Sequence, residues 1–274
     1  MKREPFRYGR GRCIFCGREP PFVKISKEHV FGDWLRELFP RDAKTTHTLG
    51  TIDLPYFGSA LRAPITRSVV GQGHAGSKKV KVVCEECNST WLSNLVEDAA
   101  KPVLKQLIAG YPGALTEEKQ KTVALWAAKT IMTAEHINRA HAVVTQEDRT
   151  WLKTTLTPPA GWFIRIAPFD GARWANLGIY QNAAKLDAKK TGTNTVEPHY
   201  LGLTFIGVGH LFVLAFYSSW SRLQSILAGM SVPHVALIWP PSGRAVGWPF
   251  SPYVLARIRG FVVGKSCFAI FLDS

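Results

Sequence analysis

The stretch KKVKVVCEECNSTW (residues 78–91) carries the pattern that decides the expected fold. It opens with lysines and valines in alternation, which is typical of a strand with one face in solvent. A Cys-x-x-Cys pair (84–87) follows at once. Asn88 or Ser89 then suits the N-cap of a helix that we expect to continue to about Leu107. The stretch therefore predicts a strand, a cysteine knuckle and a helix in direct succession.

A second Cys-x-x-Cys pair lies near the start of the chain, at Cys13 and Cys16 in the stretch CIFCG. In a reducing compartment such pairs indicate metal ligands and not disulfides. Together with Cys84 and Cys87 they supply the ligands of a tetrahedral Zn²⁺ site, and four thiolates leave no coordination position open for catalysis. We therefore expect a structural zinc that ties the two segments together. Two unrelated reduced pairs are the competing interpretation.

Three polar residues are expected to meet beside this zinc. Glu28 and His29 follow a short predicted strand, Phe22–Ile25, and Asn88 comes directly after the second cysteine pair. Carboxylate and amide oxygens suit Mg²⁺ or Mn²⁺, and a neutral imidazole can deprotonate a water molecule for attack on phosphorus. The metal would stabilise charge on the phosphate and on the leaving oxygen, so this set favours phosphodiester hydrolysis. The competing interpretation is that His29 is a structural histidine.

The order of these motifs resembles that of the HNH endonucleases of the ββα-metal superfamily. More narrowly, it is similar to a group of bacterial and phage HNH proteins with the pattern CxxC…EHVFxxWL…VVCxxCNxxW, over roughly residues 10–100. The matching residues are Cys13, Cys16, Glu28, His29, Val30, Phe31, Trp34, Leu35, Val82, Val83, Cys84, Cys87, Asn88 and Trp91.

The resemblance implies a role for each matched polar residue. His29 corresponds to the general base, Glu28 to the acidic metal ligand and Asn88 to a second metal ligand. The four cysteines correspond to the structural zinc of many members. The family's middle asparagine has no counterpart in residues 78–83, so another group must hold the segment that carries the histidine.

Weaker expectations concern five further residues. His74 is a candidate for an additional metal ligand, and His47 is a weaker one, because both lie in the long segment between the cysteine pairs. Glu97 is expected at the surface or in a capping role. Trp34 and Trp91 are expected in the core and not as platforms for nucleic-acid bases.

The net charge of +14, from 34 Lys and Arg against 20 Asp and Glu, favours a polyanionic partner such as nucleic acid. A generic basic protein is the bland alternative. For the lysines before the second cysteine pair, phosphate contacts compete with a merely solvated strand face, and for the N-terminal arginines the choice is similar. The candidate nucleic-acid-binding residues are Lys78, Lys79, Lys81, Arg10 and Arg12.

We expect an α+β fold in three parts: an N-terminal zinc-stabilised ββα-metal (HNH) module at 1–110, a helical segment at 111–157 and a β-rich C-terminal domain at 158–274. Residues 41–77 are rich in Gly, Thr, Ser and Pro and are expected to form an irregular insertion. Residues 182–198 are expected to form a polar loop.

The elements of the last two parts are predicted from caps, turns and β-rich runs. Helices are expected after the N-caps Thr116 and Thr145, and a hairpin is expected to turn near Gly207–Gly209. A further short helix is expected at Asp33–Phe39 in the first part. The expected strands are Trp162–Ile166, Trp174–Tyr180, Tyr200–Ile206, His210–Tyr217, Val235–Trp239 and Phe261–Leu272.

The charged N-terminus and the lack of a long apolar span predict no signal peptide, no membrane partner and a cytoplasmic location. The leading hypothesis is a metal-dependent endonuclease that acts on DNA. A non-catalytic, zinc-stabilised nucleic-acid-binding protein and an RNA-directed nuclease are the alternatives. Dimerisation, ligand sensing and added DNA contacts are the roles open to the C-terminal part. Phage defence or phage biology is an association of the family alone.

Overall fold

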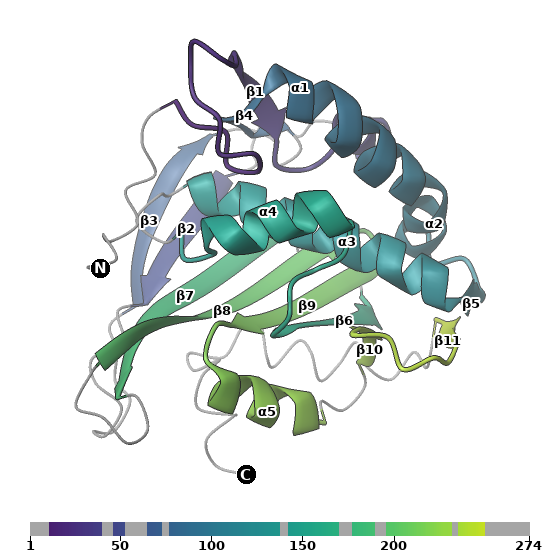
Figure 1. Ribbon diagram of the computed structural model, residues 1–274. Helices are drawn as coiled ribbons and strands as arrows, with labels where there is room; N and C mark the ends of the chain where they lie inside the picture. Colours follow the sequence, from purple (N-terminus) through teal and green to yellow (C-terminus); the bar gives the residue numbers. More distant parts are fainter. Residues whose placement is uncertain are drawn as a thin grey trace.

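The computed structural model has mixed α+β architecture, as expected (Figure 1). Helices α3 and α4 cover one face of a five-stranded sheet, and α5 lies on the other. A longer helix, which includes α1 and α2, lies outside α3. The structure describes residues 11–39, 46–52, 65–72, 77–137, 142–169, 177–189, 196–231 and 235–249.

The N-terminal part contains the predicted succession of strand, knuckle and helix. β1 (Ile25–His29) pairs antiparallel with β4 (Lys79–Cys84). The helix then runs without a break through α1 (Glu85–Cys87), a π-helical segment (Asn88–Asp98) and α2 (Ala99–Ile108). It begins at Glu85, earlier than predicted.

Two details of this part correct the sequence prediction. The helix starts early because the Cys84 sulfur accepts a hydrogen bond from the Cys87 amide at 3.4 Å and so takes the N-cap position. The first strand lies at Ile25–His29 and not at Phe22–Ile25, because residues 20–22 form a turn. His29 therefore lies on the strand itself.

The segment between β1 and β4 is more regular than predicted. A 3-10 helix occupies Asp33–Glu37, close to the expected short helix. β2 (Thr46–Ile52) and β3 (Ile65–Gln72) pair antiparallel, so the prediction of an irregular insertion at 41–77 is wrong for these two stretches. The physical reason is that the Thr, Ile and Val residues of these stretches are β-branched, a property that outweighs their loop-like Gly and Ser content.

Both predicted helix caps are confirmed. Thr116 accepts a hydrogen bond from the Lys119 amide at the start of α3 (Glu117–Ala134), and Thr145 accepts one from the Asp148 amide at the start of α4 (Gln146–Thr155). α3 is buried along most of its length, because it lies between the outer helix and the sheet.

The sheet has the strand order β10-β6-β9-β8-β7, with all neighbours antiparallel. The hairpin between β8 and β9 turns at Gly209, whose φ of +54° suits glycine, so the predicted turn is confirmed. The strands are β6 (Trp162–Pro168), β7 (Leu177–Lys189), β8 (Val196–Val208), β9 (Leu211–Ser218) and β10 (Ala236–Trp239).

Three features of the C-terminal half were not predicted. β7 and β8 continue their ladder through 182–189 and 196–198, which corrects the expected polar loop. α5 (Ser221–Gly229) is a helix where none was expected, and a short ribbon joins β5 (Gly113–Leu115) to β11 (Val246–Trp248). The expected strand Phe261–Leu272 lies outside the described residues.

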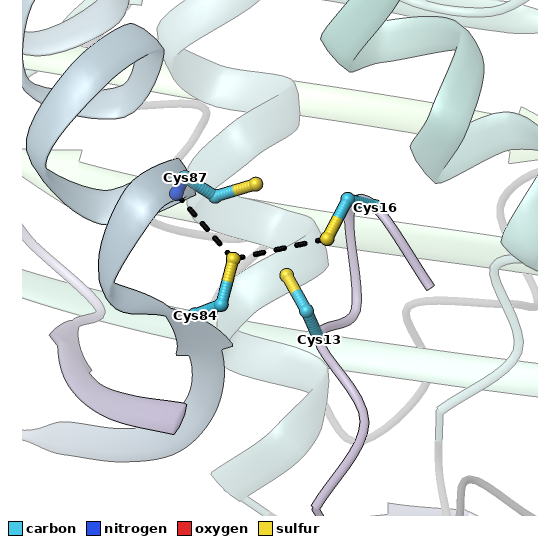
Figure 2. A group of neighbouring side chains, drawn as sticks. All are labelled: Cys13, Cys16, Cys84 and Cys87. Carbon is cyan, nitrogen blue, oxygen red and sulfur yellow. Dashed lines mark hydrogen bonds between the residues drawn. The ribbon is translucent and has the colours of Figure 1, made fainter. Parts of the chain in front are cut away.

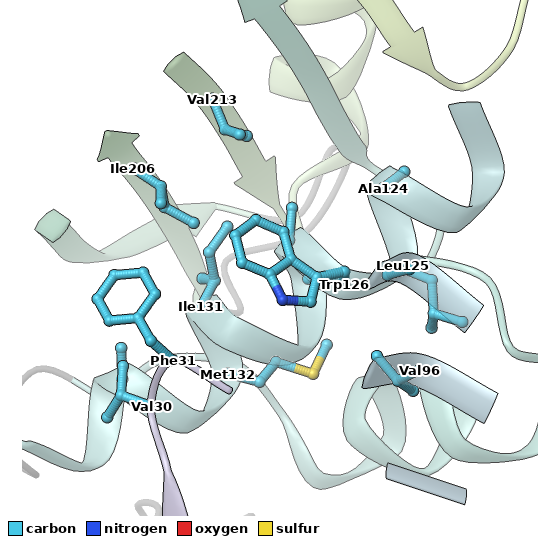
Figure 3. Close-up of a cluster of buried hydrophobic side chains, with 14 of the residues drawn as sticks. Val30, Phe31, Val96, Ala124, Leu125, Trp126, Ile131, Met132, Ile206 and Val213 are labelled. Carbon is cyan, nitrogen blue, oxygen red and sulfur yellow. The ribbon is translucent and has the colours of Figure 1, made fainter. Parts of the chain in front are cut away.

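One hydrophobic core runs through all three predicted parts, from Cys13 to Trp248. Figure 3 shows Phe31 of the N-terminal part, Trp126 and Ile131 of α3, and Ile206 and Val213 of the sheet in this cluster. The three sequence segments therefore share their stabilisation. None of the helices in the described part of the chain combines the length and apolar character of a membrane span.

Candidate metal centre and nucleic-acid interface

The four cysteines of the two predicted pairs converge at one point (Figure 2). Their sulfur atoms all lie within 4.8 Å of one another, and the sulfurs of Cys16 and Cys84 are 3.7 Å apart. A tetrahedral site with Zn–S bonds of about 2.3 Å has sulfur separations of about 3.8 Å. The geometry therefore fits a metal ion such as zinc, and the predicted convergence of the cysteines is confirmed.

Backbone hydrogen bonds hold the first knuckle against the second. The amide of Ile14 donates to the Val82 carbonyl at 2.9 Å, which attaches the knuckle to β4. The Gly17 amide donates to the Cys13 carbonyl at 2.9 Å, with φ of +71° at Gly17. The ring of Phe15 packs edge-on against Trp91, with centroids 5.0 Å apart. These contacts preorganise the four sulfurs.

The thiols perturb one another strongly. A hydrogen bond from Cys87, opposed by burial, lowers the pKa of Cys13 to about 4. The same hydrogen bond and burial raise the pKa of Cys87, and burial raises the pKa of Cys84 to about 11. The buried thiols therefore do not all ionise together unless a cation lies among them.

Glu28 lies in the interior, in a contact that the sequence did not predict. Its carboxylate is 2.8 Å from the ammonium of Lys129 on α3, whose side chain is fully buried. Lys129 also lies 2.7 Å from Glu97, which accepts a second hydrogen bond from the indole N–H of Trp34 at 2.8 Å. Glu97 is therefore a buried partner of Lys129, and the expected surface or capping role is wrong, because a buried ammonium requires carboxylates around it.

Asn88 lies against β1. Its side-chain amide nitrogen donates to the hydroxyl of Ser26 at 3.1 Å and approaches the Lys27 carbonyl at 3.5 Å. These bonds tie the start of the helix to the strand that carries His29. They hold the histidine segment, a task for which the sequence offered no candidate. The predicted core positions of Trp34 and Trp91 are confirmed, since both are buried.

His29 is at the end of β1, on the face opposite to Glu28. Its Nε2 atom lies 3.1 Å from the Oδ1 atom of Asp33, whose carboxylate also pairs with Arg36. Burial, followed by the field of Lys79, lowers the pKa of His29 below its ordinary value. The imidazole is therefore neutral at pH 7 and able to accept a proton. Asp33 was missed in the sequence, although its spacing of four residues after His29 is a usable signal.

Three lysines share the solvent face of the β1/β4 ribbon with His29. Lys27 stands opposite Lys81, and Lys79 stands opposite His29. All three lysines are exposed. The sequence predicted a binding role for Lys79 and Lys81 but not for Lys27, because the cross-strand register depends on an irregularity between Ser26 and Lys27.

The other candidate residues have different surroundings. Lys78 is half-buried, and its carbonyl accepts a hydrogen bond from the Val30 amide at 3.0 Å. Arg12 forms an ion pair with Glu19. Arg10, His74 and the side chain of His47 lie outside the described residues.

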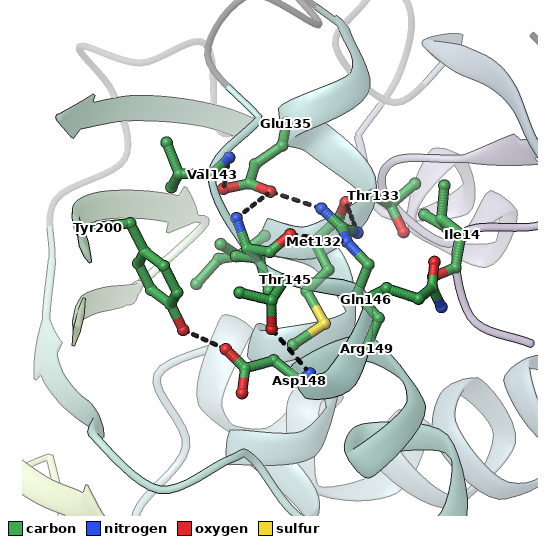
Figure 4. A network of polar contacts seen from close by, with 12 residues as sticks. Ile14, Met132, Thr133, Glu135, Val143, Thr145, Gln146, Asp148, Arg149 and Tyr200 are labelled. Carbon is green, nitrogen blue, oxygen red and sulfur yellow. Dashed lines mark hydrogen bonds and ion pairs between the residues drawn. The ribbon is translucent and has the colours of Figure 1, made fainter. Parts of the chain in front are cut away.

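A second polar network connects the cysteine cluster to the sheet through α4 (Figure 4). At one end, the Gln146 side chain donates to the Ile14 carbonyl in the first knuckle at 3.0 Å. At the other, Arg149 lies 2.6 Å from the Glu135 carboxylate, and the Tyr200 hydroxyl donates to Asp148. Burial raises the pKa of Glu135 to about 7, although Arg149 opposes this shift.

Comparison with known proteins finds no relative of this chain: no family model, no curated protein and no solved structure matches it.

Proposed function

We propose that this chain is a metal-dependent endonuclease of the HNH type that hydrolyses phosphodiester bonds in DNA. The observation that carries the proposal is the setting of His29, a neutral imidazole at the end of β1 with Asp33 beside it and Lys79 across from it. The ribbon and the helix that starts at the second cysteine pair support the same conclusion, because they have the element order of a ββα unit.

We further propose that the metal ion at the four cysteines is a structural zinc. Four thiolates fill a tetrahedral shell, so the ion has no open position for substrate. Its role is to clamp the first knuckle to the start of the helix. The clamp fixes the position of Asn88, and through the bonds of Asn88 to β1 it fixes the strand that carries His29.

His29 acts as the general base in this proposal. Its lowered pKa keeps the imidazole free of a proton at pH 7, and it removes a proton from the attacking water. Mg²⁺ or Mn²⁺ would supply charge stabilisation at the phosphate and the leaving oxygen.

Two carboxylates, those of Glu28 and Asp33, are candidates for the acidic ligand of this cation. Glu28 would have to give up its contact with the buried ammonium of Lys129. Asp33 is half exposed and already lies next to His29, so it offers a carboxylate oxygen without breaking a buried ion pair. The Asn88 amide oxygen remains the candidate for the second protein ligand.

A non-catalytic, zinc-stabilised nucleic-acid-binding protein is the second candidate function. The observation that favours it is that Glu28 and Asn88 both have protein partners, Lys129 and Ser26. Under this alternative the two residues are structural, and the chain binds DNA without cutting it.

Incubation of the purified full chain with plasmid DNA and Mg²⁺ or Mn²⁺ separates the two functions. The proposal expects cleavage by the wild type and none by His29→Ala. His199→Ala is the matched control, because it removes an imidazole that stacks on Trp220 in the sheet region. Zinc content and the thermal unfolding curve must be equal in all three proteins. Binding without cleavage under either metal contradicts the proposal, and preferential cleavage of an RNA competitor indicates an RNA-directed nuclease.

A further inference from the structure

The solvent face of the β1/β4 ribbon, made of Lys27, His29, Lys79 and Lys81, has an unusual charge pattern. The antiparallel register sets Lys27 directly opposite Lys81 and His29 opposite Lys79. The alternating residues Glu28 and Val80 are buried on the other face. Three lysines and one imidazole therefore share one face of a ribbon that is two strands wide.

This pattern opposes folding. Residues directly opposite on an antiparallel pair have Cβ atoms about 4.5–5.5 Å apart, and like charges at such positions are destabilising. Among the ion pairs of the described residues, none neutralises Lys27, Lys79 or Lys81.

Several cations on neighbouring surfaces have acidic partners. Lys24 lies 2.7 Å from Glu85, and Lys101 lies 2.6 Å from Asp98. On helix α3, Lys121 lies 2.7 Å from Glu117. Lys27, Lys79 and Lys81 have no such partner among the described ion pairs, and the carboxylate beside His29, that of Asp33, pairs with Arg36. An anion from outside the chain would complete the pattern.

The spacing of the lysines indicates a polymeric anion. Lys79 and Lys81 are two residues apart on one strand, which separates them by about 6.6–6.8 Å, and Lys27 extends the row onto the neighbouring strand. Such a row suits successive phosphates of a nucleic-acid strand better than one small anion. Lysine is a point charge, and this face lacks the Arg, Asn and Gln side chains that read base edges by bidentate hydrogen bonds.

We propose that the solvent face of the β1/β4 ribbon binds the phosphate backbone of DNA without reading its sequence, and that Lys27 and Lys81 together hold a phosphate adjacent to the one presented to His29. The inference rests on the proposed function for the identity of the anion and adds how the same site holds its substrate. Binding of this kind does not require His29 to be catalytic, so the two proposals can fail separately.

Equilibrium binding of short fluorescent DNA duplexes to the full chain tests the proposal. All proteins carry His29→Ala, so that no duplex is cut, and binding is measured over a range of salt concentrations with two unrelated sequences. The test variant adds Lys27→Gln and Lys81→Gln. The matched control adds Lys101→Gln and Lys121→Gln, which removes the same charge from helix positions that have acidic partners.

The expected result is a fall of about 0.9 in the magnitude of the slope of log affinity against log salt for the test variant, because the two lysines together hold one phosphate and each lost phosphate contact contributes about 0.9. Affinity at physiological salt should fall about tenfold or more, equally for both sequences, while the control changes less than about twofold. The thermal unfolding temperature of the test variant should not fall, because a like-charge pair is removed.

An unchanged slope in the test variant, an equal loss in the control, or a clear preference for one of the two sequences would overturn the inference. If the test variant loses binding and the wild type cuts no DNA, the phosphate-binding proposal holds and the proposed nuclease activity is wrong. If a chain that carries only Lys27→Gln and Lys81→Gln binds and cleaves DNA normally, the phosphate-binding proposal is wrong and the nuclease proposal holds.

Discussion

The ammonium of Lys129 lies 2.8 Å from the carboxylate of Glu28, and both side chains are buried. Glu97 contacts the same ammonium from the helix that follows Cys87. These buried ion pairs therefore join β1, α3 and the helix that carries Glu97, at the strand residue next to His29. In such a cluster, removal of one partner destabilises the fold by more than the ion pair contributes to its stability, because an uncompensated buried charge remains.

Lys129→Met should lower the free energy of unfolding by about 3–5 kcal/mol, measured by urea denaturation. Lys101→Met is the control, because its partner Asp98 is exposed, and it should cost less than about 1 kcal/mol. Adding Glu28→Gln and Glu97→Gln to Lys129→Met should recover part of the loss. If Lys129→Met is as stable as the wild type, the buried triad does not hold these elements together.

Removal of the metal from the four cysteines should destabilise the N-terminal part. A thiol-competing chelator, or Cys87→Ser, should abolish stoichiometric zinc and lower Tm by about 10 °C or more, because binding free energy at such a site is also folding free energy. Elemental analysis and thermal unfolding give the two readouts. Ser225→Ala, on the distant helix α5, serves as the control for the substitution. A zinc-free protein with an unchanged Tm would contradict a structural role.

The rate of DNA cleavage should rise with pH and level off by about pH 7, because the pKa of His29 lies below the ordinary histidine value of about 6.5. Asp33→Asn should shift this rise to lower pH, since the Asp33 charge stabilises the protonated imidazole. NMR titration of the His29 ring measures the same shift without any need for activity. A titration curve that Asp33→Asn leaves in place would show that the two side chains are not coupled.

Glu135 should make stability depend on pH. Burial raises its pKa from an ordinary 4.5 to about 7, so the folded chain binds a proton that the unfolded chain releases between these values. The contribution of Glu135 to stability is therefore greatest below about pH 4.5 and is lost as pH rises towards about 7. Compared with Glu135→Gln, the wild type should lose stability across this window in urea unfolding series. Parallel curves for the two proteins would contradict the shift.

The sequence predicted those features that depend on local spacing. The cysteine cluster follows from two Cys-x-x-Cys pairs, and the starts of α3 and α4 follow from Thr116 and Thr145, whose side chains cap the next turn. The early start of the outer helix could not be predicted in this way, because a cysteine sulfur, and not Asn88, takes the N-cap position.

The features that sequence analysis missed depend on partners that are distant in the chain. Glu97 was predicted to lie at the surface, because the sequence does not show that α3 places Lys129 2.7 Å from its carboxylate. Lys27 became a candidate for phosphate binding only when the register placed it opposite Lys81. This register includes an irregularity between Ser26 and Lys27 that a periodic sequence pattern does not predict. The β2/β3 pair was missed because its Gly and Ser content is typical of a loop, although its Thr, Ile and Val residues favour strands. The outer part of the β7/β8 ladder was missed because residues 182–189 are rich in polar residues and contain no β-branched residue, so only their pairing with β8 makes them a strand.

The bond from the Val30 amide to the Lys78 carbonyl closes the ribbon just beyond its last pair, so the excursion of the chain that contains β2 and β3 starts and ends at this bond. The closure entropy of such an excursion grows slowly, by about 0.6 kcal/mol for each doubling of its length. Insertions between β2 and β3 should therefore add little to the closure cost, whereas residues 30–39 cannot be exchanged freely, because Phe31 and Leu35 lie in the shared core and Trp34 donates to Glu97.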